Sequence, residues 1–189
     1  MRVLVACEFS ATVREAFASR GHDAWSCDLL PSDRGGKHLQ GDVLRILNDD
    51  WDLMIGHPPC TYLCNSGVRW LHTELGRWDK MRKAAEFFLA LFMAPIPRIC
   101  VENPIMHGYG TTIIGARATQ IIQPWMFGHG ETKATGLWLR GLPPLTPTRR
   151  VKGRQQKVHL ASPGPNRWKV RSVTFKGIAR AMSQQWGGE

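Results

Sequence analysis

Short apolar runs alternate with segments of helical periodicity along the first half of the chain. Runs rich in β-branched and other apolar residues, bounded by turn residues, predict strands at 2–7, 22–29, 51–55 and 98–102. Between these runs, apolar positions recur every three or four residues, which predicts helices at 12–20 and 78–93 and a short helix that ends at 47. This alternation predicts an α/β protein with a mostly parallel sheet and helices on both faces.

The pattern is weaker in the second half of the chain. Short strands are expected at 120–122 and 135–139, and a helix at 177–186. The stretches 56–67 and 149–168 are expected to be irregular. With 189 residues, 43% of them hydrophobic, the chain is long enough for one domain with a substantial core. We expect a core at 1–110 that binds the cofactor and carries the chemistry, and a basic irregular segment at 140–171.

Several residues with reactive or hydrogen-bonding side chains come directly after the predicted strands. They are Glu8 and Ser10 after the first strand, Asp28 after the second, Cys60 after the third, and Glu102 and Asn103 after the fourth. The carboxyl ends of parallel strands meet at one edge of a sheet, and α/β proteins bind their ligands at that edge. The sequence therefore predicts a single site there.

Cys60 is the candidate nucleophile. It follows Pro58 and Pro59, which hold the backbone extended and give the thiol a fixed direction. A thiolate is a strong nucleophile when its surroundings lower its pKa, and His57 or a helix terminus could do so. A partly buried Glu102 would keep its proton and could donate it to a ring nitrogen, which is the assistance that a thiol needs to add to a heterocycle.

Glu8 and Asp28 suit a cofactor that contains a nucleoside. The turn after the first strand of such a sheet approaches the ligand, and an acid after the second strand can bind both ribose hydroxyls. The turn at 8–11 has no Gly-x-Gly sequence, so a pyrophosphate site, and with it NAD, is not expected.

In order and spacing, residues 1–110 resemble the DNA cytosine carbon-5 methyltransferases. The segment 6–11 resembles the family's Asp-Leu-Phe-x-Gly motif, and 41–43 its Gly-Asp-Ile segment. The segment 52–60 resembles the strand and Pro-Cys loop of the family's nucleophile, Ser66-Gly67 a pair found in that loop, and 101–103 the Glu-Asn-Val motif. Asp28 stands where the family has the acid that holds the cofactor ribose. The resemblance implies a Rossmann-like, S-adenosylmethionine-dependent methyltransferase fold.

The resemblance also implies roles for individual residues. Cys60 would attack ring carbon 6 of cytosine, Glu102 would assist at ring nitrogen 3, and Asn103 would brace the Cys60 loop. Carbon 5 would then take the methyl group, and elimination would release Cys60. The residues implied to bind the cofactor S-adenosylmethionine are Glu8, Phe9, Ser10, Asp28, Asp42 and Pro59.

The chain also departs from the family pattern. Ser10 to Val13 replace the glycine-rich end of the first motif, Thr61 stands where the family favours Gln, and Pro104 where it has Val. No Gln-x-Arg-x-Arg motif follows Glu102, and Lys133 is the candidate to supply the missing charge. No large target-recognition domain is present, so the chain resembles the compact forms carried by bacteriophages and prophages. Its sequence specificity is expected to be low, or to come from a homodimer or a partner protein.

Charge points to DNA as the partner. The formal net charge is +10, and residues 140–171 hold nine Lys and Arg side chains with no Asp or Glu. A basic tract confined to one end of a chain favours binding to nucleic acid. The residues expected to contact DNA are Lys133, Arg149, Arg150, Lys152, Arg154 and Lys157.

Three alternatives remain open. Pro58-Pro59 resembles the Asp-Pro-Pro-Tyr loop of amino-group methyltransferases, but His57 and Cys60 stand where that loop has its acid and its aromatic residue. An inactive methyltransferase fold could bind DNA or protein through the basic tract with Trp138 and Trp168. A zinc site could be built from His57, Cys60, Cys64 and His72, although their spacing matches no common zinc pattern, and we expect no metal.

The composition favours a cytoplasmic protein. No apolar run reaches the roughly 18 residues of a membrane span, and the first residues lack the features of a signal peptide. The five cysteines are an odd number, and Cys7, Cys27 and Cys100 lie in or beside apolar runs, as small buried residues do in a reducing compartment. If the protein is phage-encoded, we expect it in the cytoplasm of a bacterial host.

Overall fold

The computed structural model describes residues 1–158, 160, 162–165 and 167–188. His159, Ala161 and Asn166, which belong to the predicted basic segment, and Glu189 lie outside the described residues. Within the described part of the chain, seven strands form one sheet in the order β3-β2-β1-β4-β5-β7-β6. The strands are β1 (Arg2–Ala6), β2 (Asp23–Asp28), β3 (His38–Gln40), β4 (Leu53–Gly56), β5 (Arg98–Pro104), β6 (Gln120–Ile122) and β7 (Thr135–Arg140).

The sheet is mostly parallel, as the sequence predicts. All pairs among β1 to β5 are parallel. β7 lies between β5 and β6 and runs antiparallel to both. The helices are α1 (Thr12–Ala18), η1 (Val43–Ile46), η2 (Asn65–His72), α2 (Arg77–Phe92), α3 (Gly108–Ile114), η3 (Pro124–Met126), α4 (Arg167–Ser172) and α5 (Lys176–Trp186). None of these described helices is long and apolar enough to cross a membrane.

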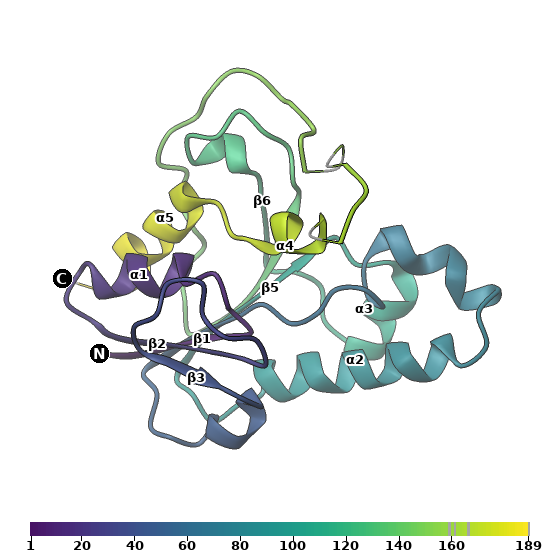
Figure 1. Ribbon diagram of the computed structural model, residues 1–189, viewed down its shortest axis with the longest axis horizontal. Coiled ribbons are helices and arrows are strands. Elements are labelled where there is room, and N and C mark those ends of the chain that lie inside the picture. The colour runs from purple at the N-terminus through teal and green to yellow at the C-terminus, as the bar shows by residue number, and fades with distance from the viewer. Residues whose placement is uncertain (159, 161, 166, 189) are drawn as a thin grey trace.

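Successive strand residues face two separate cores, because side chains alternate between the faces of a sheet. On one face, Val3 and Val5 pack with residues of α1 and α5; on the other, Leu4 and Ala6 pack with residues of α2. All four strand residues are fully buried. Figure 1 shows α1 and α5 together on one side of the sheet and α2 and α3 on the other. The prediction of helices on both faces is therefore confirmed.

Several short elements differ from the sequence prediction, and α3 and η3 were not expected at all. β3 has three residues and pairs with β2 alone, so it is too short to give a periodic signal. η2 lies partly in the stretch expected to be a loop. α4 lies at the end of the stretch expected to be irregular, and the expectation was wrong there. Its position depends on tertiary contacts: Lys169 pairs with Asp33 at 2.6 Å, and Trp168 packs against Phe9.

Candidate active site

The turn after β1 is organised by the buried carboxylate of Glu8. Glu8 accepts hydrogen bonds from the backbone N–H groups of Val13 (2.7 Å) and Arg14 (3.1 Å), and from the Ser10 hydroxyl (3.2 Å). These N–H groups belong to the first turn of α1, which lacks partners within the helix. A negative charge is also favoured at this end of a helix. Glu8 and Ser10 therefore hold α1 against the end of β1.

Phe9 is covered by the C-terminal part of the chain. Its ring meets the Trp168 ring edge-on, with 5.7 Å between centroids, and the Lys169 ammonium lies 5.3 Å from its centre. Phe9 is 7% exposed. Contact between S-adenosylmethionine and Glu8, Phe9 or Ser10 stays a prediction, since the structure commits all three side chains to other partners.

A cavity of about 390 Å³ opens beside the carboxyl ends of β1 and β2. Its size and largely apolar wall suit a small organic ligand. The residues around it are Cys7, Cys27, Asp28, Leu29, Gly41, Asp42, Val43, Leu44, Pro59 and Phe87. Asp28, Asp42 and Pro59 are among the residues predicted to bind the cofactor. Sequence reasoning missed Cys7 and Cys27, although their positions at strand ends were a signal, and Phe87, whose helix comes from elsewhere in the chain.

The two carboxylates of this cavity each have a free oxygen. Asp28 accepts from the Leu30 N–H at 2.9 Å, and Asp42 accepts from the Leu44 N–H at 3.0 Å. In each case these bonds use Oδ1, and Oδ2 has no hydrogen bond within the described residues. The free oxygens can accept from the hydroxyl or amino groups of a nucleoside. The chemistry of this cavity therefore fits the adenosine part of S-adenosylmethionine.

The cavity thiols are held neutral. Burial and the nearby charge of Asp28 raise the pKa of Cys7 well above its usual range. The same two causes raise the pKa of Cys27 to about 11. At neutral pH the charge of the cavity wall therefore comes from the two carboxylates, and the thiols contribute apolar surface.

The loop after β4 positions Cys60. The carbonyl of Cys60 accepts from the N–H groups of Leu63 and Cys64, each at 3.0 Å, which closes a tight turn. Asn103, which is buried on β5, donates from Nδ2 to the Pro58 carbonyl at 3.3 Å. This is the contact expected of a residue that braces the Cys60 loop. The catalytic role of both residues stays a prediction.

The ionisation of Cys60 is linked to that of Cys64. Interaction with Cys60 lowers the pKa of Cys64 to about 5, and Ser66, whose Oγ lies 3.1 Å from the Cys64 sulfur, acts in the same direction. Interaction with Cys64, together with burial, raises the pKa of Cys60. Of the two thiols, Cys64 is therefore the more acidic.

His57 pairs with Glu102 and not with the thiol. Its Nδ1 lies 3.2 Å from Glu102 Oε2, and the two side chains are 15% and 11% exposed. Burial alone would lower the pKa of His57, but the hydrogen bond and charge of Glu102 outweigh it and raise that pKa. Burial alone would raise the pKa of Glu102, but the charge of His57 and its hydrogen bond lower it. The two side chains therefore form a buried ion pair.

Lys133 is the common neighbour of these groups. Its positive charge lowers the pKa of His57, Cys60 and Glu102. Its backbone N–H donates to Gln123 Oε1 at 3.0 Å, which fixes the segment before β7. His57 and Glu102 are therefore in direct contact, and the charge of Lys133 acts on both of them and on Cys60.

The basic residues at 149–157 lie on an exposed extension of the chain. The backbone of Arg149 bonds with Met126 and Gly128, so this stretch runs beside the segment around η3. The guanidinium of Arg154 stacks on the Trp125 ring at 4.1 Å and donates to the carbonyls of Val151 and Gly153. The side chains of Arg149, Arg150, Lys152, Arg154 and Lys157 are exposed. Their contact with DNA stays a prediction.

The residues considered for zinc are spread over different contacts. His57 pairs with Glu102, and His72 packs against the rings of Trp78 and Tyr109. In the part of the chain that the structure describes, no three His, Cys, Asp or Glu side chains are placed to hold a metal ion.

Comparison with known proteins gives structural matches only. No protein-family model and no curated protein sequence matches the chain. A candidate DNA modification methyltransferase encoded within a prophage of E. coli has a TM-score of 0.50 and 13% identity, over 80% of this chain and 52% of its own. The Entamoeba histolytica methyltransferase EhMeth also has a TM-score of 0.50 and 13% identity, over 80% of this chain and 57% of its own. The S. pombe Dnmt2 methyltransferase has a TM-score of 0.49 and 14% identity, over 87% of this chain and 55% of its own.

The first two of these matches show that the chain has the fold of a methyltransferase. This agrees with the expected Rossmann-like architecture. The chain spans about half the length of the solved structures that it matches.

Proposed function

We propose that the protein transfers a methyl group from S-adenosylmethionine to carbon 5 of cytosine in DNA, with Cys60 as the nucleophile. The observation that carries the proposal is that the Cys60 loop is tied to the end of β5 that carries Glu102: His57 Nδ1 lies 3.2 Å from Glu102 Oε2, and Asn103 donates to the Pro58 carbonyl. A thiol and a carboxyl group at one place are what addition to ring carbon 6 of a pyrimidine requires. The methyltransferase fold is consistent with this chemistry.

In this proposal Cys60 forms and later breaks one covalent bond. Its sulfur adds to ring carbon 6, and the electrons of the 5,6 double bond move to carbon 5. Bound S-adenosylmethionine supplies the methyl group that carbon 5 attacks. Loss of the carbon 5 proton to solvent water then restores the double bond and expels Cys60. Cys60 regains its proton from Cys64, and ring nitrogen 3 returns its proton to Glu102. Stacking in a duplex shields carbon 6, so the cytosine must first flip out of the helix.

The proton of Cys60 has an acceptor close by. Cys64 interacts with Cys60, and its pKa is lowered to about 5. As the Cys60 sulfur bonds to carbon, its proton can pass to the Cys64 thiolate. Cys64 is thus proposed as the base that assists attack.

Glu102 must donate at ring nitrogen 3, and the ion pair explains how it can do so. His57 Nδ1 lies 3.2 Å from Glu102 Oε2, and the pairing lowers the pKa of Glu102 and raises that of His57, which favours the proton on His57. When ring nitrogen 3 approaches, the proton can pass from His57 through Glu102 to the ring. His57 thus acts as a proton reserve for Glu102.

Asp28→Ala should weaken binding of S-adenosylmethionine by about 1–3 kcal/mol, the cost of leaving ribose hydroxyls without a buried partner. Asp28 borders the cavity with one oxygen free. Titration calorimetry measures the affinity directly. Asp79→Ala, which changes an exposed acid on α2 that pairs with Arg82, is the matched control and should bind as the parent does. Equal affinities in both variants would remove Asp28 from the cofactor site.

DNA is the proposed macromolecular partner. The exposed residues at 149–157, together with Lys133, would follow its phosphates. Recognition of a particular sequence would come from a second copy of the chain or from another protein.

The position of the transferred methyl group tests the proposed function. The protein is incubated with duplex DNA and S-adenosylmethionine carrying a tritiated methyl group, and the DNA is digested to nucleosides and separated. Label in 5-methylcytosine is the expected result. Label on an exocyclic amine would support the amino-group alternative. DNA binding without any transfer would support an inactive binding module.

A further inference from the structure

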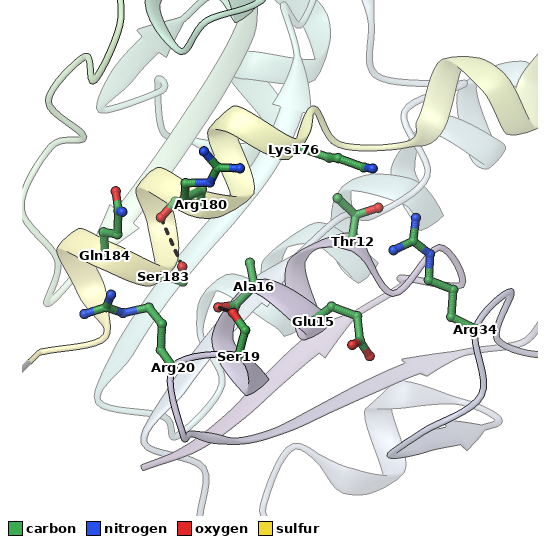
Figure 2. A pocket seen from close by; sticks show the side chains of 10 residues that line it. All are labelled: Thr12, Glu15, Ala16, Ser19, Arg20, Arg34, Lys176, Arg180, Ser183 and Gln184. Carbon is green, nitrogen blue, oxygen red and sulfur yellow. Dashed lines mark hydrogen bonds between the residues drawn. The ribbon is translucent and has the colours of Figure 1, made fainter.

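A groove of about 420 Å³ runs between α1 and α5, apart from the cofactor cavity. Figure 2 shows its side chains coming from both helices, with Arg34 added from the loop before β3. Four cationic side chains line it, which are Arg20, Arg34, Lys176 and Arg180. All four are exposed. None of them forms an ion pair or a side-chain hydrogen bond with the described residues.

The carboxylates near the groove do not neutralise these cations. Glu15, which lines the groove, is bound by the buried guanidinium of Arg14 at 2.7 and 3.2 Å. Asp33, next to Arg34, pairs with Lys169 at 2.6 Å. The groove is therefore a concave surface with four uncompensated positive charges, which concentrates anions.

One end of the groove is beside the proposed active site. Lys176 begins α5 two residues after the buried Thr174, whose side chain helps to lower the pKa of Glu102. Thr12, at the same end, begins α1 and follows the turn at the carboxyl edge of β1. In Figure 2, Lys176 and Arg34 lie toward this end, and Arg20 lies toward the other. The positive charges therefore extend away from the active site as a row.

The spacing of the row favours a polymer over a single small anion. Lys176 and Arg180 are about 6 Å apart along the helix axis, since each helical residue rises about 1.5 Å. Phosphates of one DNA strand recur about every 3.4 Å of duplex axis. The cations begin beside the proposed active site and continue along the groove. The phosphates of a DNA strand whose cytosine enters that site would follow the same path.

We propose that this groove binds the phosphodiester backbone of the DNA substrate on one side of the flipped cytosine. The proposal rests on the proposed function for the identity of the polymer. It adds a second positively charged contact surface to the exposed residues at 149–157.

The test is the salt dependence of DNA binding, measured by fluorescence anisotropy on a labelled duplex about three helical turns long. Two double variants are compared with the parent, Lys176→Gln with Arg180→Gln, and Arg20→Gln with Arg34→Gln. Each lost phosphate contact lowers the slope of log affinity against log salt by about 0.9 on duplex DNA. Either variant should therefore reduce the slope by about 1.8. Thermal unfolding at the parent's temperature shows that each variant is folded.

The matched control removes two charges from the other face of the sheet. Lys80 and Lys83 are exposed on α2, so Lys80→Gln with Lys83→Gln should leave the slope at the parent value. Parent-like slopes in both groove variants would overturn the proposal. It would also be overturned if inorganic tripolyphosphate bound in the groove of the parent while the DNA slope stayed independent of the groove residues.

Covalent trapping on DNA containing 5-fluorocytosine separates this proposal from the proposed function. Adduct formation with an unchanged slope in the groove variants means that the function stands and the groove proposal fails. A reduced slope with no adduct in the parent means that the groove binds DNA and cytosine methylation fails.

Discussion

Replacing Cys60 by serine should lower methyl transfer by roughly 10⁴-fold or more, the scale on which removal of a covalent nucleophile acts. A hydroxyl is a far weaker nucleophile than a thiol at neutral pH. Cofactor binding should stay close to the parent value, because the cavity that contains Asp28 and Asp42 is left intact. Initial rates of tritium transfer and calorimetric affinity measure the two effects separately. A fully active Cys60→Ser protein would contradict the proposed mechanism.

Trapping gives the same prediction a positive readout. On DNA with 5-fluorocytosine, fluorine cannot leave carbon 5 as a proton does, so the parent should stay covalently bound and run as a heavier band under denaturing conditions. Cys60→Ser should give no such band. Cys64→Ala is the internal control: it should still form the adduct through Cys60, although it lacks the proposed proton acceptor. If peptide mapping placed the adduct on Cys64, the assignment of Cys60 as the nucleophile would be wrong.

Replacing His57 by alanine should lower the free energy of unfolding by about 3–5 kcal/mol near pH 5.5, because it leaves Glu102 buried without its partner. The two side chains are 15% and 11% exposed, so solvent screens their interaction little. Urea denaturation of parent and variant gives the difference. His72→Ala removes an exposed histidine that packs against Trp78 and Tyr109 but is in no ion pair, and it serves as the control.

The effect should depend on pH with a definite sign. The raised pKa of His57 means that its contribution is complete below its ordinary pKa of 6.5 and is lost as the pH rises through the native value. The lowered pKa of Glu102 means that its contribution is present above its ordinary pKa of 4.5 and is lost as the pH falls through the native value. The destabilisation by His57→Ala should therefore be largest between these two pH values and smaller at alkaline pH. If the loss of unfolding free energy were the same near pH 5.5 and at alkaline pH, His57 would contribute only by filling space.

The sequence predicted the framework of the site because strand ends are visible in the hydrophobic pattern. Cys60 and Glu102 each follow a short apolar run, and parallel strands bring their carboxyl ends together. Asp28 was found in the same way, whereas Asp42 was found through the resemblance of 41–43 to a family segment; both border the cavity beside β1 and β2.

The side-chain partners within the site depend on geometry that the sequence does not carry. His57 meets Glu102 because the register of β4 and β5 pairs Gly56 with Val101, and a register is set by the whole sheet. Glu8 reaches the first turn of α1 because Ala11 adopts a left-handed conformation, with φ of 59°, just before the helix. Neither feature leaves a periodic signal in the sequence.

The packing of α5 against α1 has a consequence for synthesis of the protein on the ribosome. Val13 and Phe17 share one buried cluster with Ile178, Met182 and Trp186, which lie at the opposite end of the chain. This face of the sheet has no complete cover until α5 has emerged from the exit tunnel. Until then the nascent chain presents an apolar surface, the kind of surface that chaperones bind. Folding of this half of the core is completed only after α5 has been synthesised.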